Sequence, residues 1–246
     1  MPERPKPIIA PSLLACDFGQ FTKESKRAER SGAKWLHLDI MDGNFVPNIS
    51  FGPSVVQTTR KATKMFLDTH LMCAKPEILL EAFRKAGSDQ LTVHVELGAP
   101  VESLLWKIRS LGAKVGLAIN PPTHLSAVLP HLKLIDTLLI MTVNPGFGGQ
   151  AFIPETLTKI QQAAHWRESL GLEFRIQVDG GINELTACEC AVAGADTFVS
   201  GSALFNKPNL TAAVKRMLKR IEPLWQTGQS LAPKLNEAVD TALRAL

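Results

Sequence analysis

The stretch Trp35-Leu36-His37-Leu38-Asp39-Ile40-Met41-Asp42-Gly43 decides how the rest of the chain is interpreted. Its apolar residues and the glycine at its end predict a strand that runs into a loop. Because side chains alternate between the two faces of a strand, His37 and Asp39 share one face, and Leu36 and Leu38 share the other. Buried polar groups need partners. Two interpretations therefore stay open at this point: a hydrogen-bonded His–Asp pair with a structural role, and a metal or proton-transfer site.

Strand and helix patterns alternate along the chain around this stretch. Strands are predicted at 8–13, 34–40, 65–71, 90–95, 114–119, 137–143, 174–178 and 197–200. Helices are predicted at 18–31, 53–61, 76–86, 101–111, 124–129, 154–170 and 209–225, with a further one capped by Asn183 after the seventh strand. Eight uninterrupted strand–helix units require a parallel sheet, which at this length most simply closes into a single α/β (β/α)₈ TIM barrel. A doubly wound open sheet is the alternative, but the turn at 14–18 lacks its Gly-x-Gly-x-x-Gly sequence.

The composition is that of a globular protein. The 246 residues are 45% hydrophobic and 20% charged, which allows a large core and argues against disorder. We expect one domain, with the barrel at about 8–226 and a C-terminal extension at 227–246. Within the extension, the spacing of Leu231, Leu235, Val239, Ala242 and Leu246 predicts an extra helix that covers the barrel or a neighbouring subunit. We also expect a homo-oligomer.

Charge and hydropathy narrow the class of partner. The formal charge of +4 fits a small anionic substrate and is too weak and scattered for nucleic acid or a membrane surface. No apolar run has the length of a membrane span, and residues 1–7 lack the apolar core of a secretory signal. The four cysteines follow no disulfide spacing. We therefore expect a cytoplasmic protein without membrane or nucleic-acid partners.

Polar residues gather at the predicted strand ends, where TIM barrels carry their active sites. Ser12 ends the first strand, His37 and Asp39 the second, His70 the third and Asp179 the seventh. His37, Asp39, His70 and Asp179 supply nitrogen and oxygen donors that suit one divalent ion (Zn²⁺, Fe²⁺, Mn²⁺ or Co²⁺) and leave a position for a substrate oxygen. Each residue alone could serve packing, but four residues of ligand type at three strand ends favour the metal site. The walls are predicted to contain Met41, Met72 and Met141.

Glycine-rich loops follow the sixth, seventh and eighth strands, at 145–150, 180–181 and 200–202. Glycine lets backbone N–H groups converge on an anion, and TIM barrels commonly bind phosphate with the loops after strands seven and eight. Any one of these loops could simply be a tight turn. Three adjacent loops of this type predict a phosphorylated ligand, and the absence of Gly-x-x-x-x-Gly-Lys-Ser/Thr argues against a nucleotide-hydrolysing phosphate loop.

Long sequence strings extend this picture over about residues 8–225. They are Pro11-Ser12-Leu13-Leu14, Leu38–Gly43, Phe45-Val46-Pro47-Asn48, His70-Leu71-Met72, Val143–Gln150, Val178–Ile182 and Gly201-Ser202-Ala203. In these strings the chain resembles the ribulose-phosphate 3-epimerases. The resemblance implies an isomerase that interconverts D-ribulose 5-phosphate and D-xylulose 5-phosphate in the pentose phosphate pathway.

The resemblance also implies roles for single residues. His37, Asp39, His70 and Asp179 correspond to the family's metal ligands, with Asp39 the proton acceptor in the ribulose-to-xylulose direction and Asp179 the donor. Ser12 and His70 correspond to residues that touch the sugar. The phosphate-binding positions correspond to Gly146, Phe147, Gly148, Gly149, Gly180, Gly181, Gly201 and Ser202.

The chain departs from the family pattern at a few positions. Asn44 stands where many relatives carry His, Gln177 stands where an acidic residue is frequent, and the tail after Trp225 is longer than a barrel needs. None of these departures touches the four donor residues. They leave the exact sugar and the oligomer open.

The chemistry also follows from the residues. Removing the C3 proton of a ketose phosphate gives an enediolate, whose charge a divalent cation stabilises as a Lewis acid. Inversion then needs two acid/base groups, one on each face. Strands two and seven are three steps apart in the barrel, so Asp39 and Asp179 approach the substrate from separate directions and should titrate as a coupled pair.

Three other functions stay in view. An epimerase of a related ketose phosphate, such as D-allulose 6-phosphate, would use the same residues. A decarboxylase on this barrel would resemble the chain at Asp68-x-His70, but it would carry a lysine in place of His70. A non-catalytic sugar-phosphate binder would need no pair of opposed carboxylates.

Overall fold

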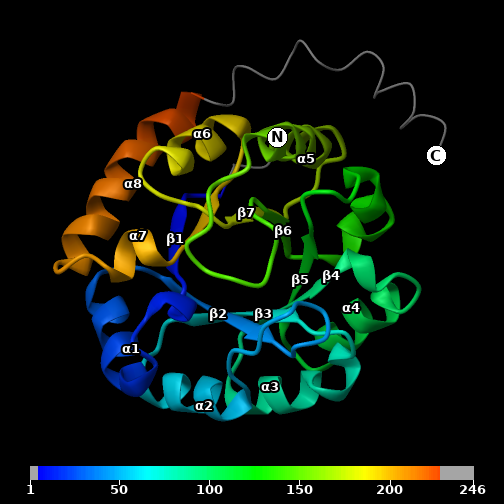
Figure 1. The fold of residues 1–246 in the computed structure, drawn as a ribbon. Coiled ribbons are helices and arrows are strands. Elements are labelled where there is room, and N and C mark those ends of the chain that lie inside the picture. The colour runs from blue at the N-terminus through cyan, green and yellow to red at the C-terminus, as the bar shows by residue number, and fades with distance from the viewer. Residues whose placement is uncertain (1–4, 228–246) are drawn as a thin grey trace.

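The computed structural model describes residues 5–227, and in that part of the chain eight parallel strands form one sheet surrounded by helices (Figure 1). The strand order is β1-β8-β7-β6-β5-β4-β3-β2, and an isolated parallel bridge between Ser12 and His37 joins the two ends of this order. The predicted TIM barrel is therefore confirmed. The strands are β1 Ile8–Pro11, β2 Trp35–Met41, β3 Phe66–Met72, β4 Gln90–His94, β5 Lys114–Ile119, β6 Thr137–Met141, β7 Arg175–Asp179 and β8 Thr197–Ser200.

Helices pack on the outside of the sheet through apolar faces. In α4, the buried residues Val101, Leu104, Leu105 and Ile108 follow the spacing of one helical face. The α-helices are α1 Phe21–Arg30, α2 Pro53–Ala62, α3 Leu80–Ala86, α4 Val101–Ser110, α5 Leu157–Ser169, α6 Thr186–Ala193, α7 Ser202–Phe205 and α8 Leu210–Thr227. The 3₁₀ segments are η1 Leu13–Ala15, η2 Phe18–Gln20, η3 Pro76–Ile78, η4 Val95–Leu97, η5 Leu125–Leu134 and η6 Pro154–Thr156.

Several helices differ from the sequence prediction in their geometry. The segment between β5 and β6 is the 3₁₀ segment η5, in which Pro130 lacks the N–H that an α-helix interior requires. The predicted helix starts at Phe18, Pro76 and Pro154 are separate 3₁₀ turns. The short helix α7 was not predicted, because four residues are too few to show a helical period. The predicted helix at 231–246 lies outside the described residues.

Strand β2 carries its side chains as the alternation predicted. Leu36, Leu38 and Ile40 belong to the apolar core, whereas His37 and Asp39 are buried among polar partners. None of the helices within residues 5–227 combines the length and the apolar composition that a membrane crossing requires.

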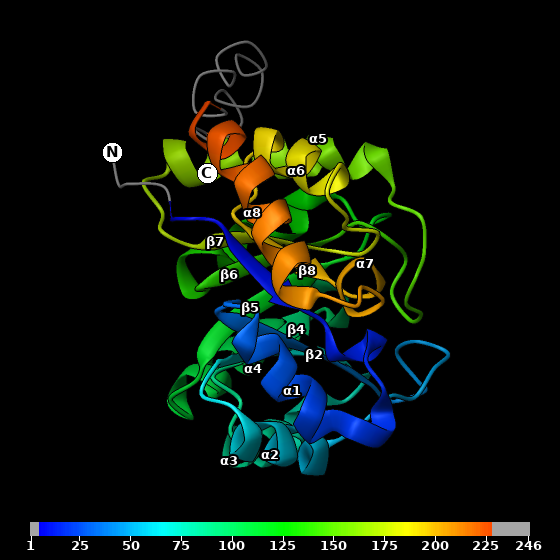
Figure 2. The same cartoon turned by 90° about the vertical axis from the view of Figure 1, so that its left-hand side faces the viewer.

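Two long loops project from the same side of the barrel (Figure 2). One follows β2 and the other follows β6, so this side is the C-terminal end of the strands. The loops meet where Asn48 Nδ2 donates a 2.7 Å hydrogen bond to the carbonyl of Gly146. In Figure 1 the loop after β6 crosses in front of the barrel opening. These loops place two walls around the site.

Candidate active site

The register of β2 and β3 places two pairs of polar residues side by side. His37 pairs with Asp68, and two residues further along Asp39 pairs with His70. Because paired residues of parallel strands point to the same face, all four side chains enter the barrel interior. Asp179 ends β7, on the other side of the β1–β2 seam.

The four predicted donor residues converge on one point. Within the described residues, His37, Asp39, His70 and Asp179 each offer one ligand atom, and these atoms all lie within 4.8 Å of one another. Oδ1 of Asp39 is 3.2 Å from His37 Nε2 and 3.4 Å from His70 Nδ1. Oδ2 of Asp179 is 3.8 Å from each of the same two nitrogens. The distances are those of donors grouped around a shared centre.

The chemistry of the group fits a divalent cation. His37 Nε2 and His70 Nδ1 are buried nitrogens with no hydrogen-bond partner among the described residues, and both face this centre. A buried polar atom without a partner carries a free-energy cost of about 1–3 kcal/mol. Two imidazole nitrogens and two carboxylates also form a donor set that transition-metal ions prefer. The predicted metal site is therefore consistent with the geometry, which does not identify the ion.

Three of the four donor residues, His37, Asp39 and His70, are held from behind by a further polar group. Ser12 Oγ donates a 2.5 Å hydrogen bond to Oδ2 of Asp39. His37 Nδ1 lies 2.7 Å from Asp68 Oδ2. Asp68 in turn accepts hydrogen bonds from the side-chain amides of Gln90 and Gln177. Carboxylates that hydrogen-bond the far nitrogen of a ligating histidine fix its orientation.

His70 has a histidine, rather than a carboxylate, as its partner. Its Nε2 lies 2.8 Å from His94 Nε2, and His94 Nδ1 lies 3.0 Å from Glu96 Oε2. Both imidazoles are fully buried. The structure thus places His94 directly against a donor residue.

Burial and charge separate the pKa values of the two aspartates. Burial acts to raise the pKa of Asp39, but the neighbouring His37 and His70 together outweigh it and hold that pKa well below its usual range. For Asp179, burial and then the negative charge of Asp39 raise the pKa to about 7. Burial lowers the pKa of His70 to about 4. Without a cation, the site thus pairs an ionised carboxylate with a carboxylic acid, a pattern typical of acid/base sites.

A pocket opens above the donors and contains most of the predicted binding residues. Its lining includes Ser12, Asp39, Met41, Met72, Met141, Gly146, Phe147, Gly148, Gly149, Asp179, Gly180, Gly181, Gly201 and Ser202. His37 and His70 do not line it, because both side chains are fully buried. The predicted contact of His70 with the sugar stays a prediction.

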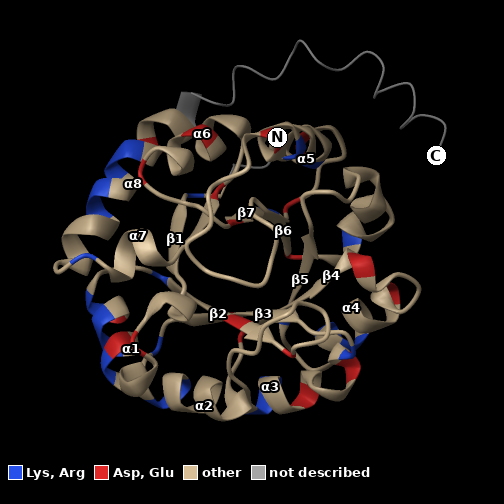
Figure 3. Ribbon diagram, viewed as in Figure 1, with Lys and Arg blue, Asp and Glu red and all other residues tan. Residues whose placement is uncertain are grey.

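No Lys or Arg lines this pocket in the described part of the chain. Basic residues are instead concentrated on the outer faces of α1 and α8 (Figure 3). An anion bound in the pocket would therefore depend on backbone N–H groups and hydroxyls rather than on a cationic side chain.

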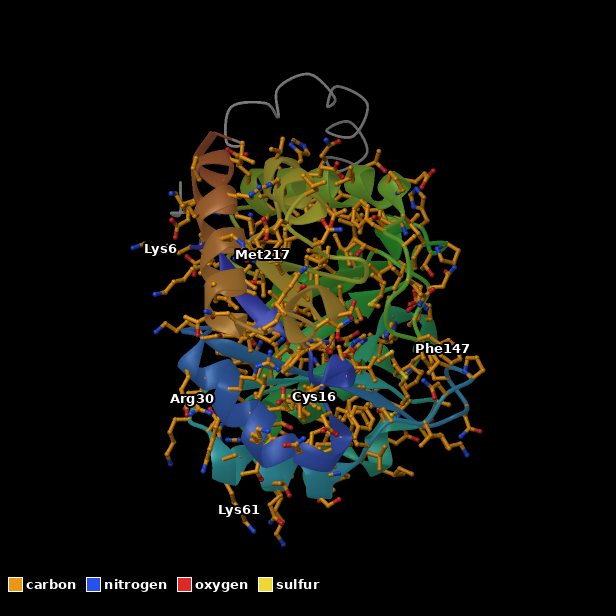
Figure 4. All side chains as sticks on the ribbon, turned by 60° about the vertical axis from the view of Figure 1, so that its left-hand side comes forward. Lys6, Cys16, Arg30, Lys61, Phe147 and Met217 are labelled. Atoms are coloured by element: carbon orange, nitrogen blue, oxygen red, sulfur yellow. The ribbon has the colours of Figure 1, made fainter. Side chains whose placement is uncertain are left out.

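The glycines after β7 are required by close packing against the loop that follows β6. Gly180 and Gly181 have φ values of +116° and +65°. A Cβ on Gly181 would lie 2.5 Å from the backbone nitrogen of Phe152. Phe147 extends from the loop after β6 at the rim of the barrel and is 56% exposed (Figure 4).

Several residues of this site were not predicted from the sequence. Val143, Asn183 and Ala203 line the pocket. Asp68 and Glu96 contact His37 and His94. Gln90 and Gln177 donate to Asp68 behind His37. The alternation of side chains along a strand could have indicated two of them. Asp68 precedes His70 by two residues, and Glu96 follows His94 by two.

The chain matches one family of known proteins along most of its length. A family model described as "Ribulose-phosphate 3 epimerase family" matches residues 8–205. The ribulose-phosphate 3-epimerase of Synechocystis sp. is 46% identical over 220 residues, covering 88% of this chain and 96% of the relative. The chloroplastic ribulose-5-phosphate-3-epimerase of Arabidopsis thaliana is 41% identical over 210 residues, covering 85% of this chain and 75% of the relative.

Similar solved structures are more distant in sequence. KGPDC from Streptococcus mutans in complex with D-R5P has a TM-score of 0.69 at 14% identity, covering 89% of this chain and 99% of that one. A 3-hexulose-6-phosphate synthase has a TM-score of 0.64 at 16% identity, covering 87% of this chain and 99% of that one. At such identities the likeness shows the barrel fold alone.

Proposed function

The chain belongs to the ribulose-phosphate 3-epimerase family and is an enzyme of that activity, and from this premise we propose that it inverts C3 of D-ribulose 5-phosphate reversibly by a two-carboxylate mechanism at a divalent-cation site. Asp39 accepts the C3 proton of the ribulose isomer, and Asp179 returns a proton to the opposite face. The observation that carries the proposal is the convergence of His37, Asp39, His70 and Asp179 within 4.8 Å beneath one pocket.

The contrast between the two carboxyl groups supports their separate roles. A group that accepts a proton must be ionised, and the pKa of Asp39 is held low by His37. A group that donates must carry a proton near neutral pH, and in the metal-free site burial and the charge of Asp39 raise the pKa of Asp179 to about 7. Ser12, through its hydrogen bond to Oδ2, leaves Oδ1 of Asp39 facing the donor centre.

His37, Asp39, His70 and Asp179 would hold the cation. When bound, it supplies Lewis-acid stabilisation of the negative charge that develops on the substrate oxygens. The two unpartnered imidazole nitrogens support this assignment. Zn²⁺, Fe²⁺, Mn²⁺ and Co²⁺ all suit this donor set.

The pocket accounts for the rest of the substrate. Ser12 and the methionine walls (Met41, Met72 and Met141) bound the sugar end. The phosphate lies against the glycine-rich loops, where Gly146–Gly149, Gly180, Gly181, Gly201 and Ser202 line the pocket. Because the lining contains no basic side chain among the described residues, backbone N–H groups hold the phosphate.

The test is turnover of D-ribulose 5-phosphate by the purified protein before and after treatment with a chelator. We expect activity that falls on chelation and returns when one of the four ions is added back. Full activity after complete removal of metal contradicts the cation site. Faster turnover of D-allulose 6-phosphate than of the pentulose contradicts the substrate assignment. A homo-oligomer and a cytoplasmic location stay predictions.

A further inference from the structure

A buried chain of three side chains leads away from His70. His70 Nε2 contacts His94 Nε2 at 2.8 Å, and His94 Nδ1 contacts Glu96 Oε2 at 3.0 Å. The two rings are stacked with their centroids 5.0 Å apart. The ring of Phe45 also packs against His94, with the two centroids 4.6 Å apart. Solvent is excluded from both imidazoles, so the two Nε2 atoms must satisfy one another.

Glu96 determines which atoms donate and which accept along this row of hydrogen bonds. An ionised carboxylate only accepts hydrogen bonds. Oε2 of Glu96 accepts from His94, and Oε1 accepts from the backbone N–H of Asn120 at 2.8 Å. Lys159 fixes the same turn, because its Nζ donates to the carbonyls of Asn120 and Pro121 at 2.9 and 2.7 Å. The carboxylate therefore has a set position and a set hydrogen-bonding role.

The protons of both histidines follow from that role. With Glu96 accepting, Nδ1 of His94 carries a proton and Nε2 of neutral His94 carries a lone pair. That lone pair accepts from Nε2–H of His70. Neutral His70 is then left with its lone pair on Nδ1, the nitrogen that faces Asp39 and Asp179.

We propose that Glu96 is a positioning residue that acts through His94 to fix the tautomer of His70, so that the Nδ1 lone pair is available to the cation. The inference rests on the proposed cation site. His37 needs no such intermediary, because Asp68 contacts its Nδ1 directly at 2.7 Å. The two histidine donors are thus oriented by carboxylates at different distances: one in direct contact and one an imidazole further away.

The Glu96→Gln substitution reverses which nitrogens of His94 and His70 carry protons, with almost no change in the shape of the side chain. The N–H of Asn120 requires an acceptor, so the amide oxygen of Gln takes the place of Oε1. The amide NH₂ then faces His94 and donates to its Nδ1. His94 must carry its proton on Nε2, and His70 must accept there and hold its own proton on Nδ1, where it blocks the cation.

The experiment uses the full chain stripped of metal with a chelator. Calorimetric titration with Mn²⁺ or Zn²⁺ should show affinity about 10- to 100-fold lower in Glu96→Gln than in wild type, the range seen when outer partners of metal ligands are changed. Glu81→Gln is the matched control, because Glu81 pairs with Lys107 on the surface. It should bind metal as wild type does.

A second readout does not depend on any variant. Long-range ¹H–¹⁵N NMR of the metal-free wild type should show His70 protonated on Nε2 and His94 on Nδ1. Glu96→Gln should invert both assignments while Glu81→Gln leaves them unchanged. The opposite tautomers in wild type overturn the proposal, even if Glu96→Gln fails to fold.

The two levels of inference fail differently. Unchanged metal affinity in a folded Glu96→Gln protein overturns the positioning role and leaves the cation site intact. Absence of metal binding in both wild type and Glu81→Gln overturns the cation site itself.

Discussion

Ser12 Oγ donates a 2.5 Å hydrogen bond to Oδ2 of Asp39, across the seam at which β1 meets β2. The contact occupies one oxygen of the carboxylate and leaves Oδ1 beside His37 and His70, at 3.2 and 3.4 Å. It therefore fixes how Asp39 is presented both to the donor centre and to a proton on the substrate.

Ser12→Ala removes this hydrogen bond and lets the carboxylate rotate. A hydrogen bond to a charged group contributes about 1.5–3 kcal/mol, so we expect kcat to fall by about 10-fold or more. Steady-state kinetics on D-ribulose 5-phosphate check this. Ser103→Ala is the control, since Ser103 Oγ donates to the carbonyl of Pro100 on the outer surface, away from the site. Equal kcat in both variants would show that Ser12 does not orient Asp39.

Asp39→Asn and Asp179→Asn should each abolish inversion, with losses of at least about 100- to 10,000-fold, because each removes one of two required proton-transfer groups. Solvent exchange separates their roles. In deuterated water, Asp179→Asn should still exchange the C3 proton of the ribulose isomer through Asp39, whereas Asp39→Asn should not. Asp136→Asn, which changes a carboxylate paired with Lys114 and Arg109 on the surface, controls for loss of charge. The reverse exchange pattern contradicts the assigned direction.

The raised pKa of Asp179 gives the metal-free protein a specific pH dependence. Its pKa is about 7 in the folded protein and 3.8 ordinarily, so its contribution to stability is complete below pH 3.8 and is lost as the pH rises through 7. Asp179→Asn cannot ionise. In chelator, its melting temperature should therefore gain on wild type between pH 5 and 8, at about 2–4 °C for each kcal/mol. A constant difference across that range contradicts the shift.

Gly181→Ala should damage phosphate binding more than sugar chemistry. The new Cβ would lie 2.5 Å from the nitrogen of Phe152 at a φ of +65°, so the loop must move. We expect KM for the phosphosugar to rise by about 10-fold or more, since about 1.4 kcal/mol of lost binding is tenfold. Inorganic phosphate should also inhibit more weakly. Gly112→Ala is the matched control, because Gly112 has a φ of +73° with open space around it, away from the pocket. The same KM in both variants contradicts the phosphate assignment.

Period-two alternation and the barrel rule were enough to predict the fold and the converging residues. His37 and Asp39 had to share a face of β2, and ends of parallel strands meet at one rim, so His70 and Asp179 followed. Both rules depend only on the order of residues along the chain, so they can be applied to the sequence alone.

The supporting residues were harder to predict, because they depend on register. His70 pairs with Thr92, so His94 stands two residues further along β4, and its ring stacks on that of His70. Gln177 reaches Asp68 across the barrel from β7. No pattern within a single strand carries either relationship. The 3₁₀ geometry of η5 likewise depended on Pro130, which the apolar spacing alone does not weigh.

The β1–β2 seam is closed, among the described residues, by the bridge between Ser12 and His37 rather than by a full ladder. The residues that close the barrel, Ser12 and His37, thus also position its donor side chains. A cation shared by His37, His70 and Asp179 would cross-link β2, β3 and β7. When the cation is removed, we expect the β1–β2 seam to open before the rest of the barrel. Amide hydrogens of β1 should then exchange faster than those on the far side of the barrel.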